Sequence, residues 1–210
     1  GFAFSQGITR VAPSGYSQKF RWNALSEFIH NFSFIRSDRA LMLTVLGIAY
    51  FWFLGSIYLL NVLVYGRDLL GLGDREISLL NASISVGIGL GAALAGKLSG
   101  DQVELGLVPI GSIGLGVFGI SLYFASHSLL LAMGGHFLLG ICGGVFIVPL
   151  DSFLQQRAGE QARGRVIGAA NILTFFGVFV GSGVLYLLSG PLKLRPDQVL
   201  LVMGVVSFGA

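Results

Sequence analysis

The sequence predicts an all-α membrane protein, a bundle of six transmembrane helices. Hydrophobic residues make up 54% of the 210 positions and charged residues only 11%, with a mean hydropathy of +0.81. Residues 105–150 contain no Asp, Glu, Lys or Arg, and three other uncharged stretches are also long enough for a crossing. Glycine, at 32 residues, is abundant inside these stretches, where small side chains let membrane helices approach closely.

The spans follow from the uncharged stretches, because about 20 residues at 1.5 Å rise cross a hydrocarbon core of about 30 Å. We expect crossings at residues 40–66, 77–96 and 166–192, and two crossings within residues 105–150. The polar cluster at 125–128 marks the break between those two. A sixth span begins near Gln198 and is expected to be truncated, so that residues 40–210 form one bundle.

Residues 1–39 are expected to contain the end of a preceding span and then a cytoplasmic linker. The chain begins at Gly1 rather than at Met, so we expect a fragment. Apolar side chains in the linker recur at steps of three and four residues, which predicts an amphipathic helix. They are Trp22, Leu25, Phe28, Ile29, Phe32 and Ile35. Such a helix would lie on the membrane surface or pack on the end of the bundle.

The orientation follows from the Lys and Arg residues in alternate connections. Nine lie in the linker and in the links after the second and fourth spans, against four in the other links. The positive-inside rule therefore places the linker, and both ends of the six-span unit, in the cytoplasm.

Small residues recur every fourth position in three spans, which predicts faces where helices pack closely. The same faces could slide past one another during a transport cycle. The glycines concerned are Gly87 and Gly91, followed by Ala95, then Gly140 and Gly144, and then Gly177 and Gly181.

Charge inside a membrane usually marks ion coupling, because burying it is costly. No charged residue falls at mid-span. Asp151 is expected at the cytoplasmic end of the fourth span, and His136 about a third of the way into it. His136 is either a packing residue or a proton relay, and the lack of a nearby carboxylate in the sequence favours packing. At the entrance to the fifth span, Arg163 or Arg165 could pair with Asp151 or Glu160 and hold a gate in one state.

Uncharged polar groups in the spans should face the bundle interior or a wet cavity, since an amide in hydrocarbon needs partners. They could bond between helices or line a cavity, and they are Asn61, Asn81, Ser83, Ser85, Asn171 and Thr174. The aromatic run at 50–53 lies deep, with Trp52 about 18 Å inside its span. Packing or an apolar cavity would explain it. The candidate cavity residues are Tyr50, Trp52, Asn81 and Asn171.

No catalytic, metal or cofactor site is predicted. The sequence contains no Gly-x-Ser-x-Gly elbow, phosphate loop, His/Cys metal spacing or His-x-x-x-x-Asp pair. Basic residues lie in short links rather than on a soluble face, so nucleic-acid binding is not expected. Cys142 is the single cysteine, which excludes a disulfide within the chain.

Six spans after a long cytoplasmic linker resemble the C-terminal half of a major facilitator superfamily transporter. The link at 96–101 falls where that superfamily carries its G-x-x-x-D-R-x-G-R loop, which makes Gly96 and Asp101 candidate gating residues. The copy departs from the pattern. Gly100 holds the fifth position with Asp101 one place later, and Val103 and Glu104 replace the expected Gly and Arg.

Four stretches resemble the bacterial lysophospholipid transporter family more specifically. These are residues 35–40, 50–55, 103–109, and the run from Pro149 through Gln155, Gln156, Arg163, Gly164 and Arg165 to Asn171. The resemblance implies a multi-pass protein of the bacterial inner membrane that flips lysophospholipids inward for reacylation. It also implies an N-terminal six-span half and, in some bacteria, fused acyltransferase and acyl-activating domains. A permease that exports amphipathic drugs, or a membrane anchor for a fused acyltransferase, are the alternatives.

Overall fold

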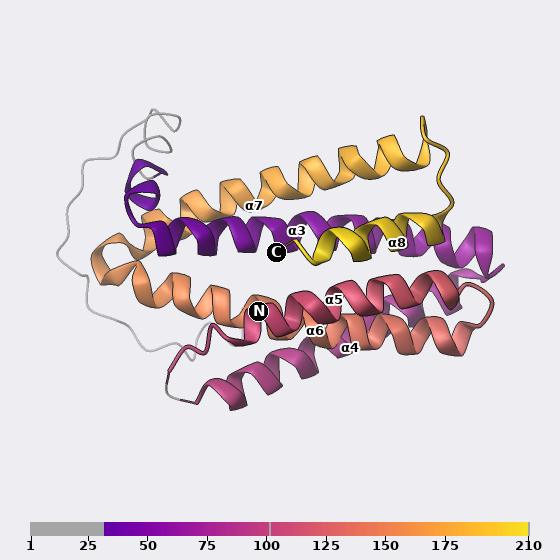
Figure 1. Ribbon diagram of the computed structural model, residues 1–210, viewed down its shortest axis with the longest axis horizontal. Helices are drawn as coiled ribbons and strands as arrows, with labels where there is room; N and C mark the ends of the chain where they lie inside the picture. Colours follow the sequence, from indigo (N-terminus) through magenta and orange to yellow (C-terminus); the bar gives the residue numbers. More distant parts are fainter. Residues whose placement is uncertain (1–31, 101, 210) are drawn as a thin grey trace, which may run out of the picture.

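The computed structural model describes residues 32–100 and 102–209, without the side chains of residues 160–162. Within that part the chain forms helices and no strands, which confirms the predicted all-α class. In order, the helices are α3 (Arg39–Val64), continued by the π-helical turn η1 (Tyr65–Leu69), α4 (Asp74–Ser99), α5 (Leu107–Phe124), α6 (Leu129–Arg157), α7 (Gly159–Ser189) and α8 (Pro196–Ser207) (Figure 1).

Five helices in the described part are long and apolar enough to cross a membrane. The sixth, α8, is apolar but has 12 residues, about 18 Å at helical rise. The break between α5 and α6 falls at the polar cluster 125–128, as predicted. Four helices extend beyond the predicted spans. η1 carries α3 on to Leu69, and α4 extends three residues beyond its span at each end. α6 continues to Arg157, and α7 begins at Gly159, before Arg163 and Arg165. The predicted spans end at the first charged residue because they are defined as uncharged stretches. A helix continues past a charged residue at the membrane edge.

Two three-helix units repeat the same packing. α7, α3, α6 and α4 lie side by side, and α5 and α8 cover one face of this row (Figure 1). The most extensive contacts join α4 to α6 and α3 to α7. If α3, α4 and α5 correspond to α6, α7 and α8, the α3–α7 pair maps onto the α6–α4 pair, and the α5–α8 pair maps onto itself. This is the packing expected of an inverted repeat of three helices plus three helices.

Polar side chains fix where several helices begin. The Asp38 carboxylate accepts hydrogen bonds from the backbone N–H groups of Ala40 and Leu41, so it is the N-cap of α3. Ser128 caps α6 in the same way. At the start of α8, Pro196 occupies the first turn, where its missing N–H is no loss.

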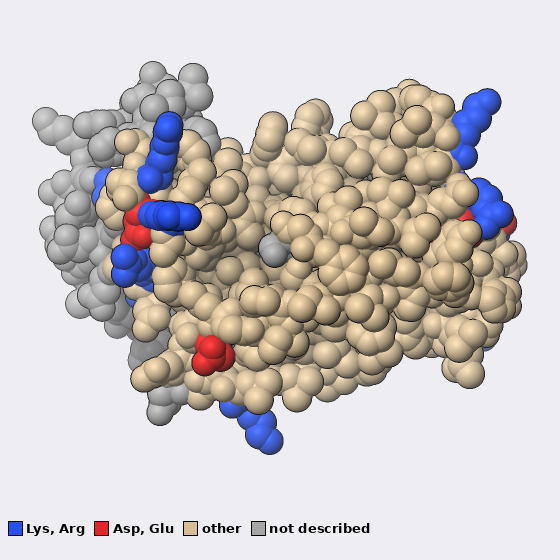
Figure 2. Space-filling model, in the orientation of Figure 1, with Lys and Arg blue, Asp and Glu red and all other residues tan. Residues whose placement is uncertain are grey.

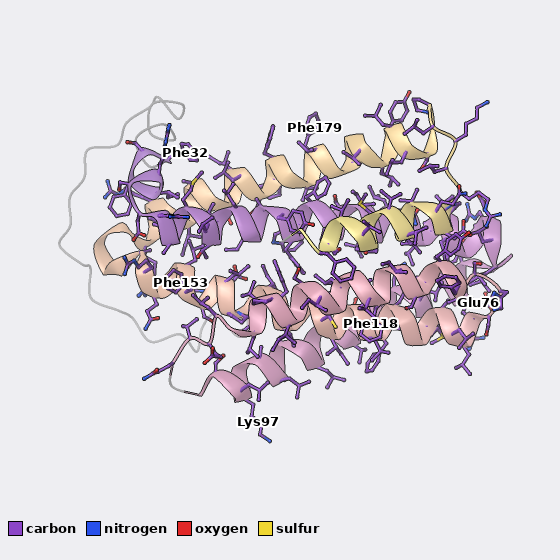
Figure 3. The ribbon with its side chains drawn as sticks, viewed as in Figure 1. Phe32, Glu76, Lys97, Phe118, Phe153 and Phe179 are labelled. Atoms are coloured by element: carbon purple, nitrogen blue, oxygen red, sulfur yellow. The ribbon has the colours of Figure 1, made fainter. Side chains whose placement is uncertain are left out.

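Charged residues lie at the two ends of the bundle. On the face shown in Figure 2, the Lys, Arg, Asp and Glu side chains leave an uncharged band between them. Glu76 and Lys97 lie near the two ends of α4, and Figure 3 shows Glu76 at the right end of the molecule and Lys97 on its lower edge, toward the other end. We call the end with Arg39, Lys97 and Arg157 the linker end. The expected amphipathic helix lies mostly outside the described residues, which include only its Phe32 and Ile35, and Ile35 is fully buried.

Candidate functional site

The described part of the chain contains two main hollows. The larger, of about 940 Å³, lies between α3, α5, α6 and α7 and reaches Gly209, just beyond the end of α8. Its walls are almost entirely apolar, and it is bordered by the first turns of α3, by Val108 and Pro109 of α5, and by Phe176 of α7. None of the residues that line it is charged, so it offers no charged group to orient a polar head, and we do not assign it to a substrate.

The smaller hollow, of about 340 Å³, we call the α3–α4–α6 pocket. Its floor is formed by α6 and by Leu115 of α5, so it opens on the face of the row that α5 and α8 leave uncovered (Figure 1). α3 and α4 touch each other little while both pack on α6, which leaves the space between them. The lining residues are Phe51, Trp52, Leu54, Gly55, Tyr58, Leu59, Ile84, Ser85, Ile88, Leu115, Leu139, Gly140, Gly143, Ile147 and Asp151.

The four residues predicted to line one cavity do not border the same hollow. Trp52 lines the α3–α4–α6 pocket. Tyr50 borders the larger hollow, and its hydroxyl donates a 2.6 Å hydrogen bond to the Val206 carbonyl, which ties α3 to α8. Asn81 donates to the Ile77 carbonyl of its own helix and borders neither hollow. Asn171 is exposed on α7 and also borders neither.

Other polar groups in the spans have structural partners. Asn61, 1% exposed, donates across the bundle to the Pro196 carbonyl at the start of α8. His136 is fully buried, with its Nδ1 2.8 Å from the Ala132 carbonyl and its ring edge-on to Tyr65. Its Nε2 has no hydrogen-bond partner within the described part of the chain. Ser83 and Ser85 donate to carbonyls of their own helix.

The gating candidates divide between described and undescribed positions. Asp101 and the side chain of Glu160 lie outside the described part, and Gly96 is exposed near the end of α4. Arg163 donates to the Gln155 carbonyl, and no ion pair among the described residues joins Arg163 or Arg165 to Asp151. Pairing of Arg163 or Arg165 with Asp151 or Glu160 to hold a gate therefore stays a prediction. In the structure, Asp151 lines the α3–α4–α6 pocket.

An ion pair that was not predicted joins two helices at the linker end. Arg157, the last residue of α6, donates from Nε to Asp38 Oδ2 over 2.6 Å. The hydrogen bond from Arg157, followed by that from the Leu41 N–H, lowers the pKa of Asp38 below its usual 3.8. The sequence separates the two residues by 119 positions, so no local pattern could have paired them.

Four of the repeating glycines lie where α4 crosses α6. A Cβ placed on Gly87 would lie 3.1 Å from the Cα of Gly140, and one placed on Gly91 would lie 2.9 Å from the Cα of Ile141. A Cβ on Gly144 would lie 2.8 Å from the carbonyl carbon of Gly91. On α7, a Cβ on Gly177 or Gly181 would overlap the α3 backbone at Ala49 or Phe53. The backbones thus approach at the distances that small residues permit.

Several pocket residues were missed in the sequence. Gly143, Ile147 and Asp151 follow one another at four-residue steps, and so do Gly55 and Leu59, so each set shares a helix face. That spacing could have placed Asp151 beside an apolar cavity. No group of three or more His, Cys, Asp or Glu among the described residues could hold a metal ion.

The fold and the pocket define a class of protein: a membrane-spanning helical bundle with inverted-repeat packing and a cavity at mid-span. Residues 7–182 match the family model described as Major Facilitator Superfamily. The chain therefore belongs to the major facilitator superfamily, and it is a multi-pass membrane protein.

Relatives within the superfamily are similar over most of the chain. It is 32% identical over 203 residues to the lysophospholipid transporter LplT of Enterobacter sp. (strain 638), covering 95% of the chain and 49% of the relative. With LplT of Escherichia coli O1:K1 / APEC the identity is 27% over 171 residues, covering 80% of the chain and 41% of the relative. The chain thus spans about half the length of these relatives or less. No solved structure matches it.

Proposed function

We propose that this chain is the C-terminal six-span half of a transporter that carries lysophospholipids inward across the bacterial inner membrane. The observation that carries the proposal is the similarity to LplT over 95% of the chain, together with an apolar pocket that has a single charged group. A lipid with one acyl chain and a zwitterionic head needs an apolar wall beside a few polar groups. An N-terminal six-span half would complete the cavity on the uncovered face of the row.

The linker end of the bundle is the cytoplasmic end in this proposal. It carries Arg36, Arg39, Lys97, Arg157, Arg163 and Arg165, whereas the opposite end carries Arg67, Arg75, Lys193 and Arg195. The positive-inside rule favours this orientation. Inward transport would then deliver the lipid to enzymes that reacylate it, whether free or fused to the transporter.

Uptake into spheroplasts tests the proposal. Cells with and without the complete protein receive labelled lysophosphatidylethanolamine, and both uptake and conversion to diacyl lipid are followed. We expect protein-dependent uptake and conversion. A complete protein that is folded in the membrane but gives no increase over cells lacking it would contradict the proposal.

Two alternatives are separated by the same cells. An exporter of amphipathic drugs would confer resistance to such drugs and give no lysophospholipid uptake. A bare anchor for an acyltransferase would do neither, yet its removal would reduce reacylation of lipid already on the cytoplasmic side. The space left between α3 and α4 favours a transporter over an anchor, because an anchor needs no cavity.

A further inference from the structure

The α3–α4–α6 pocket lies near the middle of the helices that form most of its lining. Trp52 and Gly55 of α3, Ser85 of α4, and Gly143 of α6 all fall near the centres of their helices. Trp52 is 43% exposed and forms an open apolar wall. A Cβ on Gly55 would meet no atom within 4 Å among the described residues, so this position keeps the space beside the indole free.

Asp151 stands at one end of this pocket. It follows Gly143 by two four-residue steps along the same face of α6, which places it about 12 Å from the middle of the helix. The hydrocarbon core extends about 15 Å from its midplane. In a helix whose midpoint lies at the bilayer midplane, the carboxylate would therefore be inside the core, where an ion needs a counter-charge.

No counter-charge is found in the described part of the chain. Asp151 makes no hydrogen bond or ion pair there. The nearest arginine along α6, Arg157, is already paired with Asp38, and Arg163 donates to the Gln155 carbonyl. Asp151 is also the one charged residue among those that line the pocket. The pocket thus joins an apolar wall to a single carboxylate that has no ion-pair partner among the described residues.

We propose that the α3–α4–α6 pocket binds single-chain amphiphiles whose head group carries an ammonium, with Asp151 as the counter-ion and the acyl chain along Trp52 and Gly55. The inference rests on the proposed function and deepens it, because it names the feature of the lysophospholipid that is selected. A protonated amine donates charge-assisted hydrogen bonds to the carboxylate, which a head group without an amine cannot do. The lone pairs of the Ser85 hydroxyl, whose hydrogen is donated to Asn81, can accept a second hydrogen bond from the head group.

Transport by the complete protein in liposomes tests the selectivity. Lysophosphatidylethanolamine and lysophosphatidylglycerol share a phosphate and a chain, but only the first carries an ammonium. We expect Asp151→Asn to lower the ratio of the two uptake rates at least about tenfold, and Asp151→Glu to keep most of the ratio. Asp68→Asn is the matched control, because Asp68 is also exposed but lies in η1 at the opposite end of the bundle.

The ratio is measured only on protein that is folded and active, so a loss of yield does not affect it. Equal loss of both lipids in Asp151→Asn would overturn the proposal, since Asp151 would then pair with a cation elsewhere in the protein or serve a gate. An unchanged ratio would overturn it as well.

Direct binding separates this inference from the proposed function. Bromododecylamine and bromododecanol differ in the amine and both quench tryptophan, and Trp52→Phe identifies the part of the quenching that comes from the pocket. We expect the amine to quench Trp52 in the wild type and about tenfold more of it to be needed in Asp151→Asn, with the alcohol unaffected. Such binding without any lysophospholipid transport would contradict the proposed function alone. Equal affinities of wild type and Asp151→Asn for the amine would overturn the role of Asp151.

Discussion

The Nε of Arg157 lies 2.6 Å from the Oδ2 of Asp38, which joins the last residue of α6 to the residue that caps α3. α3 and α6 are the first helices of the two three-helix units, and they correspond in the inverted repeat. The Asp38 carboxylate therefore caps the start of α3 and also binds the last residue of α6, at the linker end of the bundle.

Substitutions of Asp38 should separate these two roles. Asn keeps a side-chain oxygen that can cap α3 but loses the ion pair, whereas Ala loses both. We expect the Tm of the purified complete protein to fall in the order wild type, Asp38→Asn, Asp38→Ala. Asp74→Asn is the control, because the Asp74–Arg67 pair is more exposed and should matter little. A Tm for Asp38→Ala equal to that of the wild type would show that neither contact stabilises the bundle.

The ion pair should be insensitive to pH near neutrality. The hydrogen bond from Arg157 is the largest cause of a pKa for Asp38 below 3.8, so folding stabilises the ionised carboxylate. This contribution is complete above the unfolded-state pKa and is lost as the pH falls through the lowered folded-state value. We expect the Tm difference between wild type and Asp38→Asn to stay constant from about pH 5 to 8 and to shrink only below about pH 4. A difference that varies across the neutral range would point to another titrating group.

Close approach of α4 and α6 should make Gly91 intolerant of a side chain. A Cβ there would lie 2.9 Å from the Cα of Ile141, so even Ala forces the helices apart, at about 1–3 kcal/mol. Leu should prevent stable folding. Gly89→Leu is the matched control on the same helix, because a Cβ on Gly89 meets nothing within 4 Å among the described residues. Size-exclusion profiles and the yield of folded protein in detergent measure the difference. Equal yields of Gly91→Leu and Gly89→Leu would show that the crossing is looser than described.

The spans and their breaks could be predicted from the sequence, because charge and hydropathy are local properties. The uncharged windows located α3 to α7 and the turn between α5 and α6. Which side chains line the same cavity was harder to predict from the sequence. Tyr50 and Trp52 are two residues apart, which is about 200° around a helix, so they point to opposite faces of α3. That separation is visible in the sequence and argues against a shared cavity.

The side-chain partners that could not be predicted depend on how the helices pack. The polar side chain of Asn81 bonds to a carbonyl of its own helix, a choice that its surroundings decide and that spacing does not reveal. The Asp38–Arg157 pair and the Asn61–Pro196 bond join helices far apart in sequence. Which helices meet depends on the packing of all six, and a single sequence contains that information only indirectly.

Tyr50 should act in stability rather than in selectivity. Its hydroxyl donates to the Val206 carbonyl and lies on the α8 side of α3, away from the α3–α4–α6 pocket. We expect Tyr50→Phe to cost about 1 kcal/mol of stability and to leave the relative uptake of different lysophospholipids unchanged. Chemical denaturation and competition uptake measure the two effects. A change in lipid preference without a change in stability would place Tyr50 in a substrate path instead.

The orientation of the bundle can be tested at the two ends of its helices. Gln156, near the end of α6, is exposed at the linker end, and Ser189, the last residue of α7, is exposed at the opposite end. In a complete protein made free of cysteine, which includes Cys142→Ala, single cysteines at these positions should react from different sides. Because basic residues concentrate at the linker end, we expect an impermeant thiol reagent to label Ser189→Cys in intact cells and Gln156→Cys only after the membrane is opened. Both should react equally in detergent, which controls for burial. Labelling of Gln156→Cys but not of Ser189→Cys in intact cells would place the linker end outside the cell and contradict the proposed orientation.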